Sequence, residues 1–306
     1  MKNILAQVKE QYKQGNNIIK YLKKIENRTT NSFEDIMISY DFQAGTYVDY
    51  YNTNKESKKF REEIADTINR YVANIDNPTI FEPGCGEATT LYDICTYIRE
   101  HGKENSKMLI YALDASFSRL MVAKRFLAEK GFLATNLMMG NMLELPIADN
   151  SCDVVYTVHA CEPNGGNEEK ILKELYRVTK KYLILFEPAY DFAGDEEKRR
   201  MEEHGYAIRL FDTIQKMGLD VREHRLLENR DRITNPTGVT VIEKNEADSV
   251  SDFVVADPIS KGRLQKHNNI LHCEDSMLIY LIMDDIMCLN EDSAIIATKF
   301  SELYSK

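Results

Sequence analysis

The spacing of apolar residues along this chain changes near residue 79. Through roughly the first 75 residues the apolar positions recur at helical spacing, which predicts a helical N-terminal region. Beyond it, short apolar runs alternate with amphipathic stretches, a pattern typical of parallel strands joined by crossover helices. We therefore predict a doubly wound, mostly parallel α/β sheet covered on both faces. The runs lie at 79–82, 108–113, 135–139, 153–158 and 182–187, and the helical patterns at about 88–102, 116–130 and 167–179.

The end of this alternating region has a different pattern. A long amphipathic stretch at about 195–218 precedes two further strands, 221–228 and 238–244. Turn residues at 235–238 predict that these strands form an antiparallel hairpin that closes the sheet. The polar, aperiodic segment 245–252 then predicts a linker.

A compact, strand-rich unit of about 50 residues follows this linker. We therefore expect three parts: a helical cap or lid over 1–75, a ligand-binding core over 76–246 and a small domain over 252–306. The cap contains a tyrosine-rich stretch that includes Tyr40 and Tyr47. These tyrosines predict either core packing with solvated hydroxyls or an aromatic wall beside a ligand.

Charge and cysteine content narrow the classes of partner. The 49 acidic residues outnumber the 39 basic ones, so the formal charge is −10, and a field of that sign repels nucleic acid. No apolar run approaches the ~20 residues of a membrane-spanning helix, and the N-terminus lacks a secretory apolar region. The six cysteines are scattered without a CxxC pair. A cytoplasmic protein without disulfides is the resulting expectation, and the sequence leaves open whether it forms a homodimer.

A glycine turn after the first predicted strand is the first candidate ligand site. The segment 82–88 reads Glu-Pro-Gly-Cys-Gly-Glu-Ala and leads directly into a predicted helix. Gly84 and Gly86 allow a sharp turn and a close approach of the backbone to a ligand, and the helix N-terminus offers unpaired N–H groups. Taken alone, this pattern serves NAD, FAD and other nucleotides equally well, or forms only a tight turn.

An acidic residue at the end of the second predicted strand narrows the class of ligand that this turn could bind. Asp114 lies 32 residues after Glu82 and can accept hydrogen bonds from both hydroxyls of a ribose, although an isolated aspartate also caps helices. The complete GxGxxG pattern of a dinucleotide site is absent, which disfavours NAD.

In this order of motifs, residues 40–244 resemble the class I S-adenosylmethionine-dependent methyltransferases. The resemblance rests on 81–88, on Asp114, on 140–142 and on 145–155, with Asn141 where the family often has aspartate. It implies a seven-stranded sheet and S-adenosylmethionine as cofactor. The residues it implies as cofactor contacts are Glu82, Gly84, Cys85, Gly86, Asp114, Ala115, Asn141, Met142 and His159.

The resemblance also places the transferred methyl group near the end of the fourth strand. There His159 is the candidate general base, because an imidazole titrates in the right range. Residues just after this strand also contact the cofactor through their backbone alone, so a purely structural role stays open. The candidate acceptor contacts are Tyr40, Tyr47, Glu162, Glu187 and Tyr190.

The C-terminal unit resembles the small zinc-ribbon-like subunit that activates several methyltransferases in eukaryotes and archaea. Those proteins have cysteine where this chain has Asp257, Ser260 and Ser276, and only Cys273 remains. One thiolate is not a structural zinc set, so we expect no bound metal.

Three functional hypotheses follow from these observations. The first is methyl transfer to a small molecule, such as an amino sugar, a sugar nucleotide or an amino-acid-like amine or hydroxyl compound, because a cap encloses small acceptors. The second is an RNA or protein methyltransferase, suggested by the relatives of the C-terminal unit. The third is a scaffold that keeps the fold without catalysis, and the near-complete cofactor motif argues against it.

Overall fold

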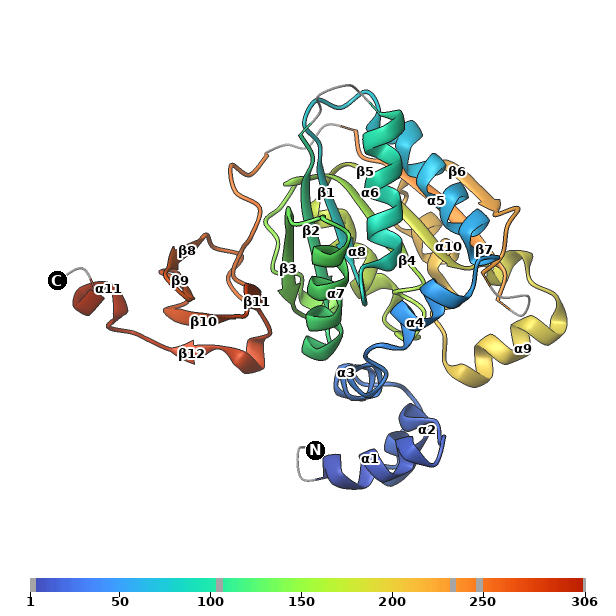
Figure 1. Cartoon of the computed structure of the whole chain (residues 1–306), viewed down its shortest axis with the longest axis horizontal. Coiled ribbons are helices and arrows are strands. Elements are labelled where there is room, and N and C mark those ends of the chain that lie inside the picture. Colours follow the sequence, from blue (N-terminus) through green and yellow to red (C-terminus); the bar gives the residue numbers. More distant parts are fainter. Residues whose placement is uncertain (1–3, 103–106, 232–234, 246–249, 305–306) are drawn as a thin grey trace.

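One continuous sheet organises the molecule in the computed structural model, which describes residues 4–102, 107–231, 235–245 and 250–304 (Figure 1). Within these residues twelve strands belong to the sheet, and its main path runs β6-β7-β5-β4-β1-β2-β3-β11-β10-β9-β8. In the same residues no helix is long and apolar enough to cross a bilayer.

The first seven strands form the predicted doubly wound core. Five are parallel, and β6 and β7 pair antiparallel at the end of the sheet beside β5. The predicted hairpin is therefore confirmed, although Thr237 and Gly238 belong to β7, and part of the connection (232–234) lies outside the described residues. The strands are β1 (Thr79–Pro83), β2 (Leu109–Asp114), β3 (Thr135–Met139), β4 (Cys152–Val158), β5 (Thr179–Pro188), β6 (Asp220–Leu226) and β7 (Thr237–Glu243).

Two apolar layers hold helices against the faces of this sheet. One layer joins the strands to α5, α6 and α7, and the other joins them to α8 and α10 (Figure 1). The amphipathic stretch predicted at 195–218 is two helices, because Gly205 adopts a left-handed conformation and ends the first of them. The helices are α5 (Ser57–Val72), α6 (Thr89–His101), α7 (Phe117–Glu129), α8 (Glu168–Val178), α9 (Asp195–His204) and α10 (Leu210–Lys216).

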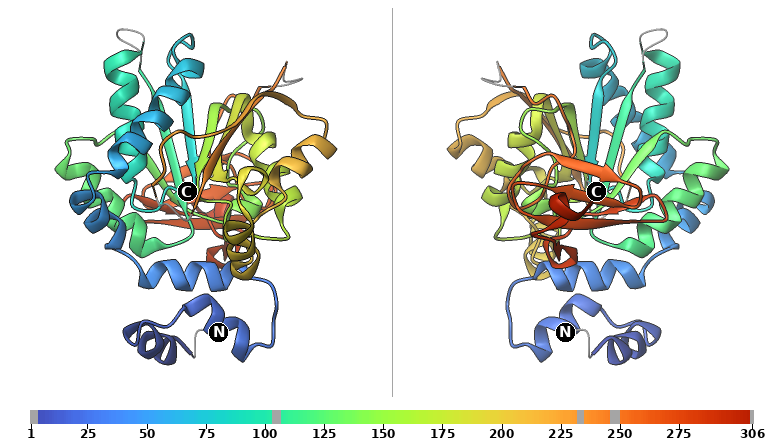
Figure 2. Two further views of the ribbon diagram at one scale, coloured as in Figure 1. Left: turned by 90° about the vertical axis from the view of Figure 1, so that its right-hand side faces the viewer. Right: turned by 90° about the vertical axis from the view of Figure 1, so that its left-hand side faces the viewer.

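The N-terminal region is helical, as predicted, and the tyrosine-rich stretch within it is helical too. Three helices lie below the lower edge of the sheet in Figures 1 and 2, namely α1 (Leu5–Lys13), α2 (Ile18–Ile25) and α3 (Phe33–Phe42). A fourth helix, α4 (Thr46–Thr53), packs against the layer that contains α6 and α7. Ser32 and Asp35 form a capping box at the start of α3, and Arg28 binds both carboxylate oxygens of Asp35 at 2.6 and 2.7 Å. We call α3 and α4 the lid.

The C-terminal unit continues the sheet of the core. Its strand β11 pairs parallel with β3, and the backbone N–H of Leu289 donates to the carbonyl of Met139. Of the predicted linker 245–252 and the boundary at 246, residues 246–249 lie outside the described residues. The elements are β8 (Leu264–His267), β9 (Ile270–Cys273), β10 (Leu278–Met283), β11 (Ile286–Cys288), β12 (Ile295–Ile296) and α11 (Phe300–Tyr304). Short 3₁₀ turns cover Met142–Glu144, Tyr190–Phe192 and Glu291–Ser293.

The four positions compared with zinc ligands lie close together within this unit. The Asp257 carboxylate accepts hydrogen bonds from the backbone N–H and the hydroxyl of Ser260, at 2.9 and 2.5 Å, and from the Tyr280 hydroxyl at 2.5 Å. The Ser260 hydroxyl lies 3.5 Å from the Cys273 sulfur. The Ser276 hydroxyl, at the fourth position, lies close enough to Asp257 to help lower the pKa of that carboxyl. A partly buried polar cluster thus holds this turn together.

Candidate functional site

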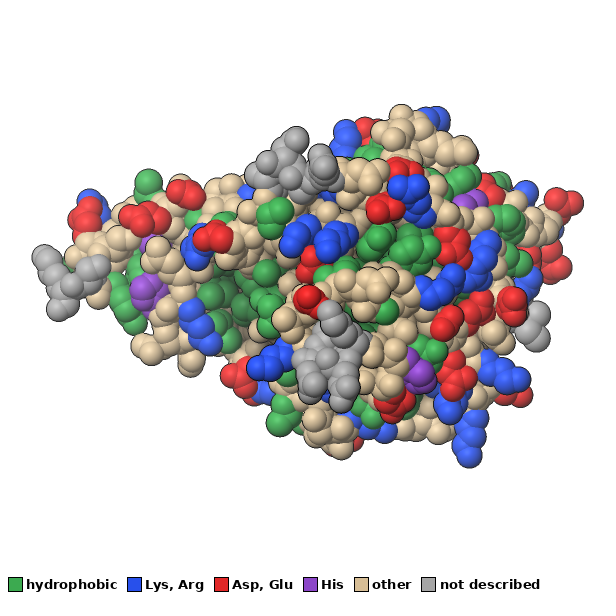
Figure 3. Space-filling view, turned by 90° about the horizontal axis from the view of Figure 1, so that it is seen from above, with side chains coloured by type: hydrophobic (Ala, Val, Ile, Leu, Met, Phe, Trp, Pro, Cys, Tyr) green, Lys and Arg blue, Asp and Glu red, His purple; other side chains and the backbone are tan. Residues whose placement is uncertain are grey.

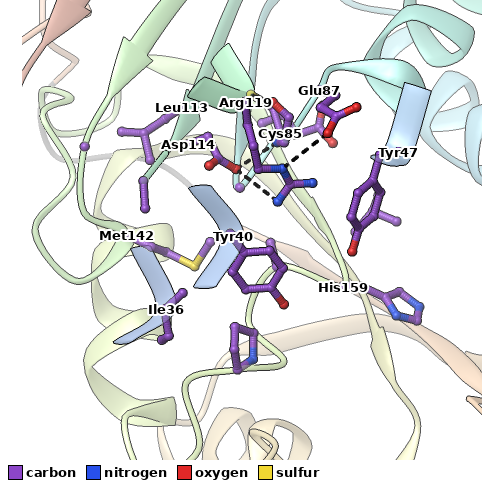
Figure 4. Close-up of a pocket in the computed structure, with 18 of the residues that line it drawn as sticks. Ile36, Tyr40, Tyr47, Cys85, Glu87, Leu113, Asp114, Arg119, Met142 and His159 are labelled. Atoms are coloured by element: carbon purple, nitrogen blue, oxygen red, sulfur yellow. Dashed lines mark hydrogen bonds and ion pairs between the residues drawn. The ribbon is translucent and has the colours of Figure 1, made fainter. Parts of the chain in front are cut away.

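A cavity of about 150 Å³ lies between the carboxyl ends of β1, β2 and β4 and the lid (Figure 4). In doubly wound sheets this edge is where ligands usually bind. All nine residues predicted as cofactor contacts line the cavity. They are Glu82, Gly84, Cys85, Gly86, Asp114, Ala115, Asn141, Met142 and His159.

The glycine turn has the geometry that its residues predict. Gly84 has a φ of +80°, and a Cβ added there would lie 2.3 Å from the Cβ of Ala160. Gly86 has a φ of +56°, and its added Cβ would lie 2.4 Å from a guanidinium nitrogen of Arg119. Position 84 therefore needs glycine, whereas a side chain at Gly86 would displace the Arg119 guanidinium, and the turn forms a cradle in which backbone faces the cavity.

Asp114 connects the end of β2 to this turn. One carboxylate oxygen accepts from the N–H of Gly86 and the other from the N–H of Ser116, each at 2.9 Å. A carboxylate has about four acceptor sites, so both oxygens retain capacity for hydroxyl groups of a ligand. Asn141 lies across the cavity, where its side chain caps the 3₁₀ turn through the N–H of Leu143.

Glu82 is a buried acid at the floor of the cavity. The Tyr156 hydroxyl donates to its carboxylate at 2.9 Å. Burial nevertheless raises the pKa of Glu82 to about 8, because the charged form loses its hydration and the Tyr156 hydrogen bond compensates only in part. The side chain is therefore mostly protonated at neutral pH until a cation approaches it.

Two charged residues of the cavity were missed by the sequence analysis. Glu87 is buried and accepts from the N–H groups of Gly45 and Val48, at 2.8 and 2.7 Å, and so holds the start of α4. Arg119 lies 4.0 Å from both Glu87 and Asp114. The sequence could have indicated Glu87, because it directly follows the glycine turn. It could not have indicated Arg119, because a single arginine in a helix has no distinguishing pattern.

The lid lines the cavity and is anchored to the core. The central carbon of the Arg119 guanidinium lies 5.1 Å from the ring centroid of Tyr40 and 4.4 Å from that of Tyr47 (Figure 4). Asp41 accepts from the Ser116 hydroxyl at 2.6 Å and from the N–H and hydroxyl of Ser118. The lid thus borders the cofactor side of the site, whereas the sequence analysis assigned its tyrosines to the acceptor alone.

A second cavity of about 340 Å³ adjoins the first and shares part of its lining, including Tyr40, Tyr47, Val158 and His159. Its walls combine aromatic rings with polar and charged side chains. The aromatic residues are Tyr40, Tyr47, Tyr50, Tyr51, Phe60 and Tyr206, and the charged ones are Arg61, Arg200, Glu162 and Asp231.

His159 lies where the two cavities meet. It directly follows β4 with a φ of +52°, which is unusual for a residue other than glycine and common at functional sites. Its Nδ1 lies 3.1 Å from the Glu162 carboxylate and its Nε2 lies 2.7 Å from the Thr237 hydroxyl. Burial favours the neutral ring, but the hydrogen bond and charge of Glu162 outweigh it, and the pKa of His159 is raised.

Two predicted acceptor contacts do not reach either cavity. Glu187 turns behind the loop that follows β4, where one oxygen accepts from the N–H groups of Ala160 and Cys161 at 3.0 and 3.1 Å. Tyr190 donates to Glu202 at 2.5 Å on the exposed side of the molecule. Both line a separate small hollow, so the structure does not bring them together with the other candidate acceptor contacts.

Residues 81–185 match a protein family described as "Methyltransferase domain". Among curated proteins, the chain is similar to demethylmenaquinone methyltransferases. It is 29% identical to that of Anoxybacillus flavithermus over 136 residues and 26% identical to that of Geobacillus stearothermophilus over 155 residues. These alignments cover 43% and 51% of this chain but only 54% and 59% of the relatives, so the chain spans a little over half of their length.

Two solved structures share the fold at low sequence identity. A Methanococcus maripaludis protein described as an S-adenosyl-L-methionine-dependent methyltransferase has a TM-score of 0.50 and 14% identity, over 68% of this chain and 95% of that one. A complex between the Haloferax volcanii Trm112 methyltransferase activator and a methyltransferase contains a chain with a TM-score of 0.50 and 15% identity. That match covers 66% of this chain and 96% of the other.

Proposed function

We propose that this protein transfers a methyl group from S-adenosylmethionine to a small-molecule acceptor, because residues 81–185 match a methyltransferase domain and the sheet has the corresponding topology. The observation that carries the proposal is the pair of adjoining cavities. One is lined by every residue that the cofactor motifs single out, the other combines aromatic rings with polar and charged side chains, and both include His159.

The cofactor cavity suits the chemical groups of S-adenosylmethionine, which supplies an activated methyl group on a sulfonium. Asp114 would hold the ribose hydroxyls, and Glu82 would face the methionine ammonium. Asn141 and Met142 would border the adenine, and the cradle at Gly84 and Gly86 leaves room for the ligand to approach the backbone.

The remaining residues would align the acceptor and handle its proton. Displacement at a sulfonium methyl requires mainly alignment of the attacking atom, since the donor is already activated. Nε2 of His159 would accept a proton from the acceptor once the acceptor replaces the Thr237 hydroxyl as its hydrogen-bond partner. Glu162 would orient the ring through its contact with Nδ1. The lid would exclude water from both cavities.

The acceptor that fits these walls is small, carries a hydroxyl or amine, and presents an apolar or ring face to the tyrosines. Amino sugars, sugar nucleotides and amino-acid-like amines remain candidates, and the similarity to demethylmenaquinone methyltransferases adds ring compounds. RNA fits less well. On the face of the described residues seen in Figure 3, acidic and basic side chains are interspersed, and a nucleic-acid site favours clustered basic residues.

A methyl-transfer assay tests the proposal. S-adenosylmethionine with a radiolabelled methyl group would be incubated with the protein and with each acceptor class, with bulk RNA as the competing substrate. Saturable labelling of one small-molecule class supports the proposal. Labelling of RNA alone would favour an RNA methyltransferase over the proposed function. Failure of S-adenosylhomocysteine to bind in calorimetry would contradict methyltransferase activity itself.

His159→Ala is expected to lower kcat by about 10²–10⁴-fold, the usual contribution of a general base, with a much smaller change in cofactor affinity. The raised pKa of His159 further implies that the wild-type rate increases with pH through that pKa, because only the neutral ring accepts a proton. His224→Ala is the matched control, since that histidine stacks on Phe211 outside both cavities. Equal loss in both variants would indicate a structural effect.

We also propose that the C-terminal unit takes the place of a separate activator subunit by covering the β3 edge. Support comes from the β11–β3 pairing and from two backbone hydrogen bonds: Ala256 N–H donates to Pro146, and Ala148 N–H donates to Val254. The Haloferax volcanii complex pairs a chain of the same fold with an activator.

Asp257→Ala tests what holds this unit together. Loss of the carboxylate leaves the Tyr280 and Ser260 hydroxyls without their acceptor, at a cost of about 1–3 kcal/mol. The midpoint of thermal unfolding should fall by about 2–4 °C for each kcal/mol. Asp252→Ala, at an exposed ion pair with Arg263, should change it little. A chelator should leave the wild-type midpoint unchanged, whereas one zinc per chain after dialysis would contradict a metal-free unit.

A further inference from the structure

Arg119 is a buried cation in the cofactor cavity that the motifs do not account for. Only 8% of its side chain is exposed, and its Nε has no hydrogen-bond partner among the described residues. The nearest carboxylates, Asp114 and Glu87, lie at 4.0 Å, beyond hydrogen-bond range. Burying a guanidinium this way is costly unless an anion completes its hydrogen bonds.

The surroundings of the guanidinium hold it toward the cavity. It lies against Gly86, which leaves room for it by lacking a Cβ, and the rings of Tyr40 and Tyr47 face it from the lid (Figure 4). Cation–π contacts favour a charged arginine here without using its N–H donors. The donors therefore remain available for a planar anion, which arginine binds through two parallel hydrogen bonds.

The charges of the cavity complement those of the cofactor assigned to it. S-adenosylmethionine carries two cationic groups, the sulfonium and the ammonium, and one anionic group, the carboxylate. The lining residues with carboxylates are Glu82, Glu87 and Asp114, and among the described lining residues Arg119 is the one arginine or lysine. We propose that Arg119 binds the α-carboxylate of the methionine moiety, an inference that rests on the proposed function through its cofactor.

A two-by-two calorimetric comparison tests this assignment. Wild type and Arg119→Gln are each titrated with S-adenosylhomocysteine and with its decarboxylated analogue, which lacks only the carboxylate. The wild type should prefer the carboxylated ligand by about 10–100-fold, the range for hydrogen bonds between charged groups. Arg119→Gln should bind both ligands with similar affinity. Arg225→Gln, at an arginine paired with Glu63 and Glu223 away from the cavity, should keep the wild-type preference.

Two results overturn the assignment: a wild type without preference, or an Arg119→Gln variant that retains the preference, including one that binds both ligands more weakly by the same factor. If Arg119→Gln does not fold, Arg119→Lys is compared in its place. That variant keeps the charge without the planar fork, so a reduced preference supports the proposal and an unchanged one overturns it. If the wild type binds neither ligand, the cofactor assignment is contradicted, and the proposed function is contradicted with it.

Discussion

Gly84→Ala is expected to weaken the binding of S-adenosylhomocysteine by at least about 100-fold, which corresponds to roughly 2.7 kcal/mol. The added methyl group would overlap the Cβ of Ala160 at 2.3 Å, so the turn or the loop after β4 must move. Alanine would also have to adopt a φ of +80°, at a cost of about 1–2 kcal/mol. The overlap and the backbone strain both change the shape of the cradle into which the cofactor would fit. Calorimetric titration measures the loss.

Gly131→Ala is the matched control for this variant. Gly131 also has a positive φ, +71°, but an added Cβ there meets no atom within 4 Å. This substitution therefore introduces the backbone strain without the overlap, at a site outside the cavity. It should lower the unfolding temperature slightly and leave cofactor affinity unchanged. Wild-type affinity in Gly84→Ala would show that the cradle does not contact the cofactor.

Cofactor binding near pH 7 is expected to release close to one proton from Glu82. With a pKa of about 8, this buried side chain is protonated in about nine of ten molecules at pH 7. An ammonium group beside it favours the carboxylate, so its pKa falls on binding and the proton leaves. Affinity should therefore rise with pH up to about 8 and level off above it. Titrations in buffers of different ionisation enthalpy count the protons.

Two variants check that Glu82 is the source of this proton. Glu82→Gln cannot release it, so binding should become weaker and independent of pH across this range. Tyr156→Phe removes the hydrogen bond that favours the charged carboxylate, so the pKa of Glu82 should rise further and the affinity curve should shift to higher pH. Proton release that persists in Glu82→Gln would assign the titration to another group.

The core fold and the cofactor cavity were predictable because their signals are local. The strands from β1 to β5 are buried apolar runs, and turn residues and helix starts separate them. Parallel strands bring their carboxyl ends to one edge, so Glu82 and Asp114 had to meet once the strands were identified.

Side-chain direction and long-range pairing were not predictable in this way. Glu187 ends β5 as Glu82 ends β1, yet its carboxylate turns to the backbone of Ala160 and Cys161. The pairing of β11 with β3 joins segments about 150 residues apart and leaves no periodic signal in either. The surroundings of Arg119 include Tyr40 and Tyr47, which belong to another part of the chain, so the sequence around Arg119 gives no sign of them.

The anchoring of the lid by Asp41 and Glu87 has a thermodynamic consequence. Both carboxylates bridge the lid to the loops that carry Gly86, Ser116 and the rest of the cofactor cavity. A ligand that orders those loops therefore stabilises the closed lid, and reciprocity requires that the closed lid stabilise the ligand by the same free energy. We therefore expect any opening of the lid to be coupled to cofactor exchange, so that an acceptor that closes the lid would also retain the methyl donor.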